Sequence, residues 1–162
     1  PISRGRRRWR IRMSDLEKGL RFIANVLWHI PFLGFLNALY AFLLGLLLPV
    51  LVIPAPIGLG LMQYAKFLLF PFSSKMVDVS ETGAPRNPLW AAYSAVIMIL
   101  YLPFGLIAFI VGAVQCFGLA ITIVGLPGAY IIFKSLGTYF NPVGKVCMPL
   151  APGEAPPIDF KR

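Results

Sequence analysis

The sequence predicts an all-α integral membrane protein made of two helical hairpins, each interrupted by proline and glycine. Of its 162 residues, 58% are hydrophobic and only 13% are charged, whereas soluble globular domains average about 25% charged residues. Two stretches, residues 22–65 and 87–133, contain no formally charged residue. As one straight helix at about 1.5 Å per residue, each would be about twice as long as the hydrocarbon core is thick. Each stretch must therefore fold back on itself.

Residues 1–21 form a predicted basic arm that leads into the first helix. Three kinds of partner suit such an arm: nucleic acid, anionic lipid headgroups or an acidic partner subunit. Headgroups are the nearest anions because apolar residues begin at position 22, and nucleic acid is not expected because only Trp9 is an interleaved aromatic residue. The net charge is +9, and six of the bases are Arg4, Arg6, Arg7, Arg8, Arg10 and Arg12.

The segment that begins at Met13 has the signature of a helix start, because Ser14 and Glu17 have the spacing of a capping box. Residues 1–12 then form an extension, which suits either the end of a mitochondrial presequence or a bacterial cytoplasmic arm. Cys116 and Cys147 lie far apart in the sequence and fit no metal or redox motif. No metal and no cofactor are expected.

The first half is expected to hold a long apolar helix over residues 22–51 and a shorter apolar segment over residues 57–72. A polar linker over residues 73–89 follows them. Between the two apolar segments the run is broken by helix-interrupting residues, namely Pro54, Pro56 and Gly58.

The second half follows the same plan, with a long helix over residues 90–121 and a short segment over residues 129–140. Its break contains Gly125, Pro127 and Gly128. The proline-rich tail, residues 148–162, is expected to be extended.

The two halves are predicted to be internal repeats, over about residues 23–77 and 87–147, within one membrane domain over residues 22–147. The sequence "NVLW" at residues 25–28 recurs as "NPLW" at residues 87–90. Two prolines of the first half, Pro56 and Pro71, recur 71 residues later as Pro127 and Pro142.

The distribution of bases predicts the orientation. If each hairpin returns to its starting side, the arm, the linker and the tail all lie on one side, and their bases place that side in the cytoplasm by the positive-inside rule. Both termini of a bacterial inner-membrane protein would then be cytoplasmic; the alternative is the matrix side of a mitochondrial inner membrane. Trp28 and Trp90, each near the start of a long helix, suit an interfacial aromatic belt.

The second half carries a set of short motifs: "ITIVGLPG" over residues 121–128, "FK" at residues 133–134, "PVGK" over residues 142–145 and "VQC" over residues 114–116. In the first half "LVIPAPIG" replaces the turn, Gln63 stands at the position of the lysine, and "PFSSK" replaces the ending. The chain resembles the YccF family of small bacterial inner-membrane proteins over about residues 23–147. The resemblance implies an inner-membrane component built from paired repeats and implies no particular activity.

Both turns between long and short segments are apolar, which leaves two interpretations open. A turn at the outer interface would cap a hairpin that spans the membrane. A turn at membrane depth would be the tip of a re-entrant hairpin, and its free backbone groups would need cover from protein or a water-filled cavity.

Polar side chains inside the apolar segments are candidates for a pathway. A lysine near the end of such a segment is expected to extend its ammonium group to the interface, and the alternative is a pair of inward ammonium groups that favour anion passage. Glutamine and threonine can hydrogen-bond between helices or face a pore. These residues are Gln63, Lys66, Gln115, Thr122 and Lys134.

Small residues recur at every fourth position in the second half, a pattern that lets helices approach closely in lipid. It predicts a helix-packing face, either within the fold or between protomers. The face consists of Ala108, Gly112, Cys116 and Ala120.

No enzyme activity is expected, because all six acidic residues lie outside the apolar segments and the chain has a single histidine. The leading functional interpretation is a structural or accessory component that packs against copies of itself or a larger membrane complex. The alternative is a small homo-oligomeric ion channel or pore, made anion-selective by Lys66 and Lys134.

Overall fold

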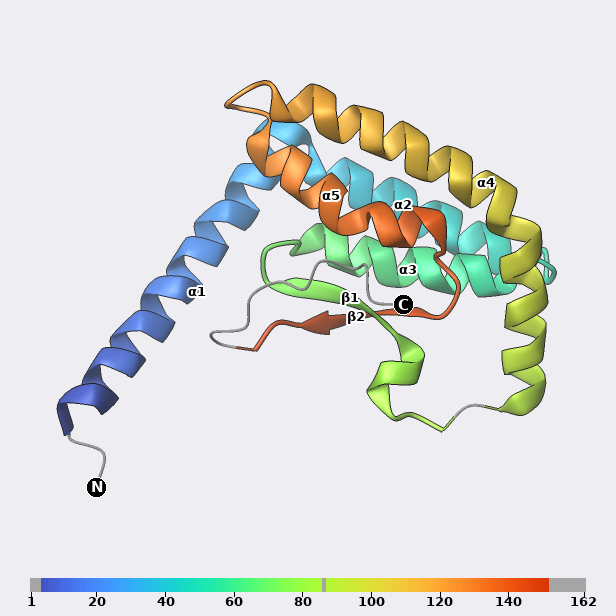
Figure 1. Cartoon of the computed structure of the whole chain (residues 1–162), viewed down its shortest axis with the longest axis horizontal. Helices are drawn as coiled ribbons and strands as arrows, with labels where there is room; N and C mark the ends of the chain where they lie inside the picture. Colours follow the sequence, from blue (N-terminus) through green and yellow to red (C-terminus); the bar gives the residue numbers. More distant parts are fainter. Residues whose placement is uncertain (1–3, 86, 152–162) are drawn as a thin grey trace.

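The computed structural model describes residues 4–85 and 87–151, with the backbone alone for residues 4–14 and 31. This part of the chain is mainly helical, as predicted, but it also contains two strands. In Figure 1, α2, α3, α5 and most of α4 run alongside one another, and the sheet lies on one side of this helical layer. The elements are α1 (Arg4–Phe32), α2 (Gly34–Val50), α3 (Ala55–Leu69), β1 (Ser74–Asp78), the 3-10 helix η1 (Val79–Thr82), α4 (Pro88–Ala120), α5 (Leu126–Phe140) and β2 (Lys145–Pro149).

The first helix differs from the prediction at both ends. It begins at Arg4, before the expected start at Ser14. The predicted single helix over residues 22–51 is wrong, because the chain breaks at Leu33, whose φ of 49° is left-handed. Pro31 lacks the backbone N–H that would extend the helical ladder. The two helical segments on either side of the break, 15–30 and 34–50, differ in direction by 78°, so α1 stands away from the helical layer (Figure 1).

The break after α1 is built around Trp28. Its indole Nε1–H donates to the carbonyl oxygen of Leu68 at 2.9 Å, and the side chain is buried. A Cβ on Gly34 would lie 2.1 Å from the indole Nε1, so only glycine lets the backbone pass there. The expectation that Trp28 lies in an interfacial belt is therefore wrong, because this indole packs inside the protein.

Within each half, the long helix packs against the short helix through small residues. A Cβ on Gly45 of α2 would lie 2.8 Å from the backbone nitrogen of Met62 of α3. A Cβ on Gly105 of α4 would lie 2.1 Å from the carbonyl oxygen of Phe140 of α5. The absence of a Cβ allows the helix backbones to approach this closely.

The predicted small-residue face of α4 meets α5 at two of its four positions. A Cβ on Gly112 would lie 2.7 Å from the ring of Tyr139. The Cys116 thiol donates to the carbonyl oxygen of Ala129 at 3.3 Å. Ala108 is half-buried and Ala120 is exposed. Gly112 and Cys116 thus serve packing within the chain.

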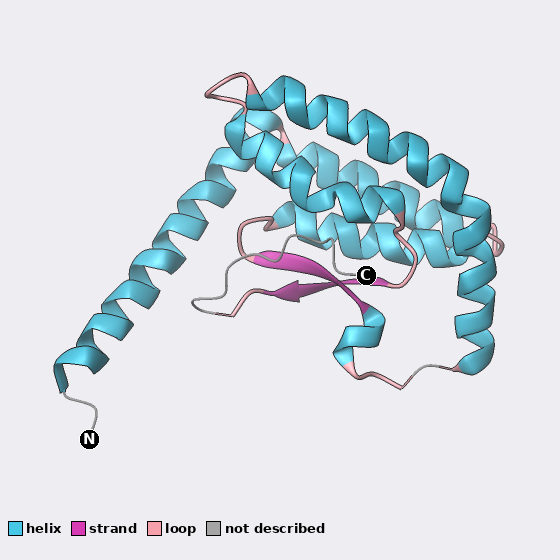
Figure 2. Cartoon of the chain, in the orientation of Figure 1, coloured by secondary structure: helices cyan, strands magenta, loops and turns pink. Residues whose placement is uncertain are grey.

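The two strands overturn the predicted polar linker over residues 73–89 and shorten the extended tail, whose first residues belong to β2. β1 and β2 pair antiparallel, with Met76 opposite Cys147 at the centre and Asp78 opposite Lys145 at one end. The strands are far apart in the sequence and join the two halves of the chain (Figure 2). A five-residue strand has too little pattern of its own to be told from a polar linker, and here a partner strand from the other half stabilises it.

The corresponding elements of the two halves are separated by a constant interval. The bounds of α3 and α5, and those of β1 and β2, differ by the same 71 residues. The central pair of the sheet, Met76 and Cys147, has this separation too. In Figure 1, the turn between α2 and α3 lies beside α4 at one end of the layer, and the turn between α4 and α5 lies beside the end of α1 at the other.

The outer face of the helical layer is apolar. α2 and α4 contain no charged residue, and leucine, isoleucine, valine and phenylalanine side chains of both helices are exposed. Among the residues that the structure describes, α4 is long and apolar enough to cross a membrane, and the bent pair of segments 15–30 and 34–50 passes that test only together. The buried core lies between α1, α2, α3, α5 and β1, around Phe67 and Ile131.

A buried asparagine attaches α1 to the turn before β1. The Asn25 side chain accepts from the backbone N–H of Phe72 at 3.1 Å and donates to the hydroxyl of Ser73 at 2.9 Å. We expect Asn25→Ala to lower the free energy of unfolding by about 1–3 kcal/mol, because the half-buried N–H of Phe72 loses its acceptor. Thermal unfolding in detergent measures this change.

Asn37→Ala is the matched control for that substitution. Asn37 is exposed, and its amide makes only a 3.4 Å contact with the carbonyl oxygen of Phe32. We expect a change in the free energy of unfolding within about 0.5 kcal/mol. Equal losses in the two variants would contradict the role assigned to Asn25.

Candidate functional site

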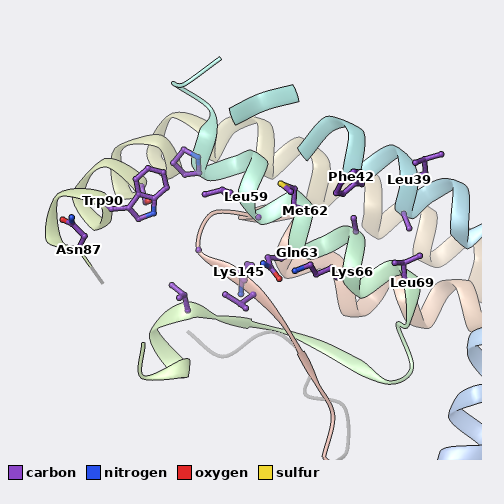
Figure 3. Close-up of a pocket in the computed structure, with 18 of the residues that line it drawn as sticks. Leu39, Phe42, Leu59, Met62, Gln63, Lys66, Leu69, Asn87, Trp90 and Lys145 are labelled. Atoms are coloured by element: carbon purple, nitrogen blue, oxygen red, sulfur yellow. The ribbon is translucent and has the colours of Figure 1, made fainter. Parts of the chain in front are cut away.

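An amphipathic groove of about 660 Å³ opens between α2, α3, the start of α4 and β2. The volume lies within the range of pockets that bind small molecules. Figure 3 shows Phe42, Leu59 and Met62 on α2 and α3, and Gln63, Lys66 and Lys145 on the side toward the sheet. We call it the α2–α3 groove. Its lining includes Phe35, Ala38, Leu39 and Phe42 of α2, Leu59, Gly60, Met62, Gln63, Lys66 and Leu69 of α3, Val79, Asn87, Trp90 and Ser94 before and within α4, and Lys145 of β2.

Helical spacing explains the apolar wall. The four lining residues of α2 follow the i, i+3, i+4, i+7 pattern, which places them on one face of the helix. Four of the lining residues are alanine or glycine, namely Ala38, Gly60, Ala65 and Gly144. At Gly60 the missing Cβ leaves room for the carbonyl oxygen of Pro142, which would lie 1.8 Å from it.

The polar end of the groove consists of Gln63, Lys66 and Lys145, which lie close together in Figure 3. The Nζ of Lys145 lies 3.4 Å from a carboxylate oxygen of Asp78, its opposite neighbour in the sheet. The side-chain oxygen of Gln63 accepts the backbone N–H of Cys147 at 3.4 Å. Lys66 is exposed, and within the described part of the chain no acidic side chain pairs with it. The end therefore carries one unbalanced positive charge among these three residues and Asp78.

Lys134 lies in a different environment, between the two halves. Its side chain is only 6% exposed, so the predicted extension of its ammonium group to water is wrong. The Nζ donates to the carbonyl oxygens of Pro71 and Ser74 at 2.7 and 2.8 Å and lies 5.0 Å from the centre of the Phe67 ring. These groups replace water around the ammonium ion, and the contact holds α5 against the turn before β1.

Burial lowers the pKa of Lys134 to about 8, and the positive charge of Arg21 adds to this effect. Lys134 lies on α5, which has 15 residues and is therefore shorter than a helix that spans a bilayer. An amine with this pKa is mostly protonated at pH 7. Lys134 therefore binds the carbonyl oxygens of Pro71 and Ser74 mainly as a cation.

The other predicted pathway residues are not brought together with Lys134. Gln115 is exposed on α4. Thr122 lies beyond the end of α4, where its hydroxyl donates to the carbonyl oxygen of Leu119 and accepts the N–H of Gly125. It thus shapes the second turn. Lys66 and Lys134 do not form a pair of inward ammonium groups, since one borders the groove and the other is enclosed.

The two predicted breaks are short turns at the starts of α3 and α5. Pro54 is the residue before α3 and Gly125 the residue before α5, with Pro56 and Pro127 in the first turns of these helices, where a missing N–H costs nothing. Gly58 and Gly128 follow in the helices and are buried. These residues terminate one helix and start the next.

Sequence reasoning missed one residue that fixes the first turn. The Tyr93 hydroxyl lies 2.7 Å from the carbonyl oxygen of Val52 and 2.8 Å from that of Ile53. Its single proton can be donated to either oxygen, and the Val52 oxygen also accepts the backbone N–H of Ala55 at 3.1 Å. An aromatic residue in an apolar helix carries no signal for this role.

The six arginines of the arm, Arg4 to Arg12, lie in α1 by their backbone, and their side chains are outside the described residues. Among the described residues no group of three or more metal-ligating side chains comes together. Comparison with protein-family models, with curated proteins and with solved structures finds no match for this chain. The resemblance to the YccF family therefore stays a prediction.

Proposed function

We propose that the chain is a non-enzymatic membrane protein that acts as a structural or accessory component of a membrane assembly, in keeping with its resemblance to the YccF family. The observation that carries the proposal is the separation of apolar and charged surface. The exposed side chains of α2 and α4 are mostly apolar and none is charged, whereas the charged residues that the structure describes lie on α1, α3, α5 and the segment that contains the sheet. Such a surface would leave the outer face of the helical layer in lipid and the sheet in water.

We further propose that the halves are repeats inserted from one side of the membrane, with both apolar turns re-entrant. The 71-residue interval between corresponding elements supports the repeat. The bend of 78° after α1 and the position of the two turns at opposite ends of the layer (Figure 1) support re-entry. If both hairpins crossed the membrane from the same side, both turns would lie at the same end of the helical layer.

The inner membrane of a bacterium, with the termini and the sheet in the cytoplasm, is the location that the basic arm favours by the positive-inside rule. The matrix side of a mitochondrial inner membrane fits the same distribution of charge. The arginines of the arm would bind anionic headgroups or an acidic subunit. Self-association into a homo-oligomer fits the large apolar surface as well.

The ion channel has less support. Of the two lysines that would select anions, Lys134 already binds two backbone oxygens, which makes it a structural residue. Lys66 borders a groove on one side of the chain.

Cysteine labelling tests the re-entrant arrangement. In a chain with Cys116→Ser and Cys147→Ser, single cysteines are introduced as Ala55→Cys or Leu126→Cys, and intact cells are treated with a membrane-impermeant thiol reagent. We expect no labelling from outside, because both turns stay within the membrane or on its inner side.

Ala84→Cys is the control for this experiment, since Ala84 is exposed in the polar segment before α4. We expect it to react only from the cytoplasmic side, in inverted vesicles. Labelling of Ala55→Cys or Leu126→Cys from outside would show that the hairpins span and would overturn re-entry. A chain that does not sediment with membranes at all would overturn the membrane proposal itself.

A further inference from the structure

We propose that the α2–α3 groove binds one anionic phospholipid, with its phosphate at Gln63, Lys66 and Lys145 and an acyl chain along α2 and α3. This inference rests on the proposed insertion into a membrane. It concerns a site in the body of the protein, separate from the arginine-rich arm. The basis is the combination of an apolar channel and a net positive end in one cavity.

The apolar part of the groove suits a hydrocarbon chain. Phe35, Leu39 and Phe42 line it from α2, and Leu59 and Met62 line it from α3. These side chains carry no charged group or hydrogen-bond donor, so they match a hydrocarbon chain and not a polar ligand. A polar metabolite would leave this wall unmatched.

The polar end suits a singly charged phosphodiester. Lys66 supplies the positive charge that no described acidic side chain balances, and the Lys145 ammonium is shared with Asp78. Because the Gln63 oxygen accepts the N–H of Cys147, its amide nitrogen is the group left to donate to an oxygen of the phosphate. Ammonium and amide donors around one phosphate form charge-assisted hydrogen bonds.

The position of the groove matches the position of a lipid headgroup. Its apolar wall belongs to the helical layer, and its polar end faces the sheet (Figure 3). In the proposed orientation, the boundary between layer and sheet is the boundary between hydrocarbon and water. A phosphate at Lys66 would therefore sit at the depth that phospholipid phosphates already occupy.

The charge distribution also predicts which phospholipid binds. A phosphatidylglycerol headgroup adds no cation beyond the phosphate. A phosphatidylcholine headgroup would bring a quaternary ammonium group near Lys66 and Lys145, where like charges repel. The groove should therefore prefer the anionic lipid.

The test is native mass spectrometry of the full chain in a mild detergent, titrated with phosphatidylglycerol or with phosphatidylcholine of the same acyl chains. We expect the first phosphatidylglycerol to bind about fivefold more tightly than the first phosphatidylcholine. Lys66→Gln should abolish most of this preference while leaving the melting temperature unchanged. Leu59→Trp, which places a larger side chain in the groove, should weaken the binding of both lipids.

Lys18→Gln is the charge-matched control, because Lys18 is an exposed lysine on α1 outside the groove. It removes the same charge and should keep the preference for phosphatidylglycerol. If Lys18→Gln reduces the preference as much as Lys66→Gln does, binding follows net charge and the site is wrong. Equal affinity of the unmodified chain for both lipids would also overturn the proposal, while sedimentation with membranes would show that the proposed insertion still holds.

Two further outcomes would assign the groove to another occupant and overturn the proposal that it binds a phospholipid. One is displacement of bound phosphatidylglycerol by inorganic phosphate at equal concentration, which would make it a site for a free anion. The other is a lipid-free dimer that Leu59→Trp dissociates, which would make the groove an interface between two copies of the chain.

Discussion

Replacement of Lys134 by methionine is expected to destabilise the protein strongly, although methionine has a similar length and is more apolar. The carbonyl oxygens of Pro71 and Ser74 would lose the ammonium group that both accept from. Each buried acceptor without a partner costs about 1–3 kcal/mol, and relief from burying the charge offsets part of the sum. We expect a net loss of about 2–4 kcal/mol, visible as a melting temperature in detergent lower by about 5–10 °C.

Lys66→Met is the matched control, because it removes the same charge from the other short helix at an exposed position. In lipid-free detergent its melting temperature should stay within about 2 °C of the unmodified chain. If both variants have the melting temperature of the unmodified chain, Lys134 does not hold α5 to the turn before β1. A large loss in Lys66→Met alone would reverse the roles given to the two lysines.

A single added methyl group at Gly60 is the second change with a large expected effect. A Cβ there would lie 1.8 Å from the carbonyl oxygen of Pro142 and 2.7 Å from its carbonyl carbon. Because these atoms belong to the backbone, α3 and the segment before β2 must move apart. The alanine gains about 1 kcal/mol in helix propensity, but overpacking of this kind costs about 1–3 kcal/mol or more. We expect Gly60→Ala to lower the melting temperature in detergent or to prevent folding.

Gly118→Ala provides the comparison. Gly118 lies in α4, and nothing is within 4 Å of a Cβ built on it. Alanine at this position should therefore only favour the helical conformation, without a steric clash. We expect the free energy of unfolding to rise by up to about 1 kcal/mol. Gly60→Ala that is as stable as Gly118→Ala would contradict the close approach of α3 to Pro142.

The long apolar helix of the second half could be predicted well, because its composition alone specifies it. Uncharged stretches longer than a bilayer is thick must contain turns, and proline and glycine mark where α3 and α5 start. The break at Leu33 could not be predicted in this way. Pro31 and Gly34 signal it only weakly, and the bend depends on the fit of Gly34 beside Trp28, a contact that exists only after α1 and α3 pack.

The groove was foreseen only in part. Gln63 and Lys66 were candidates because polar residues inside an apolar segment are conspicuous. Asp78 and Lys145 were not, because in the sequence they belong to a polar linker and to the end of the second half. Pairing of β1 with β2 brings them to the groove, and no periodicity within a five-residue strand reveals that register.

Three properties can be derived from the residues alone: the mainly helical class, the positions of the turns before α3 and α5, and the uneven distribution of charge. These properties follow from the local chemistry of each residue: hydrocarbon side chains, missing backbone donors and formal charges. Three others emerge only in the folded chain: Lys134 is enclosed while Lys66 is exposed, two distant segments form one sheet, and an apolar wall and a basic end share one groove. Those properties depend on contacts between residues far apart in the chain, which pack by shape and by hydrogen bonds that the order of the residues does not specify.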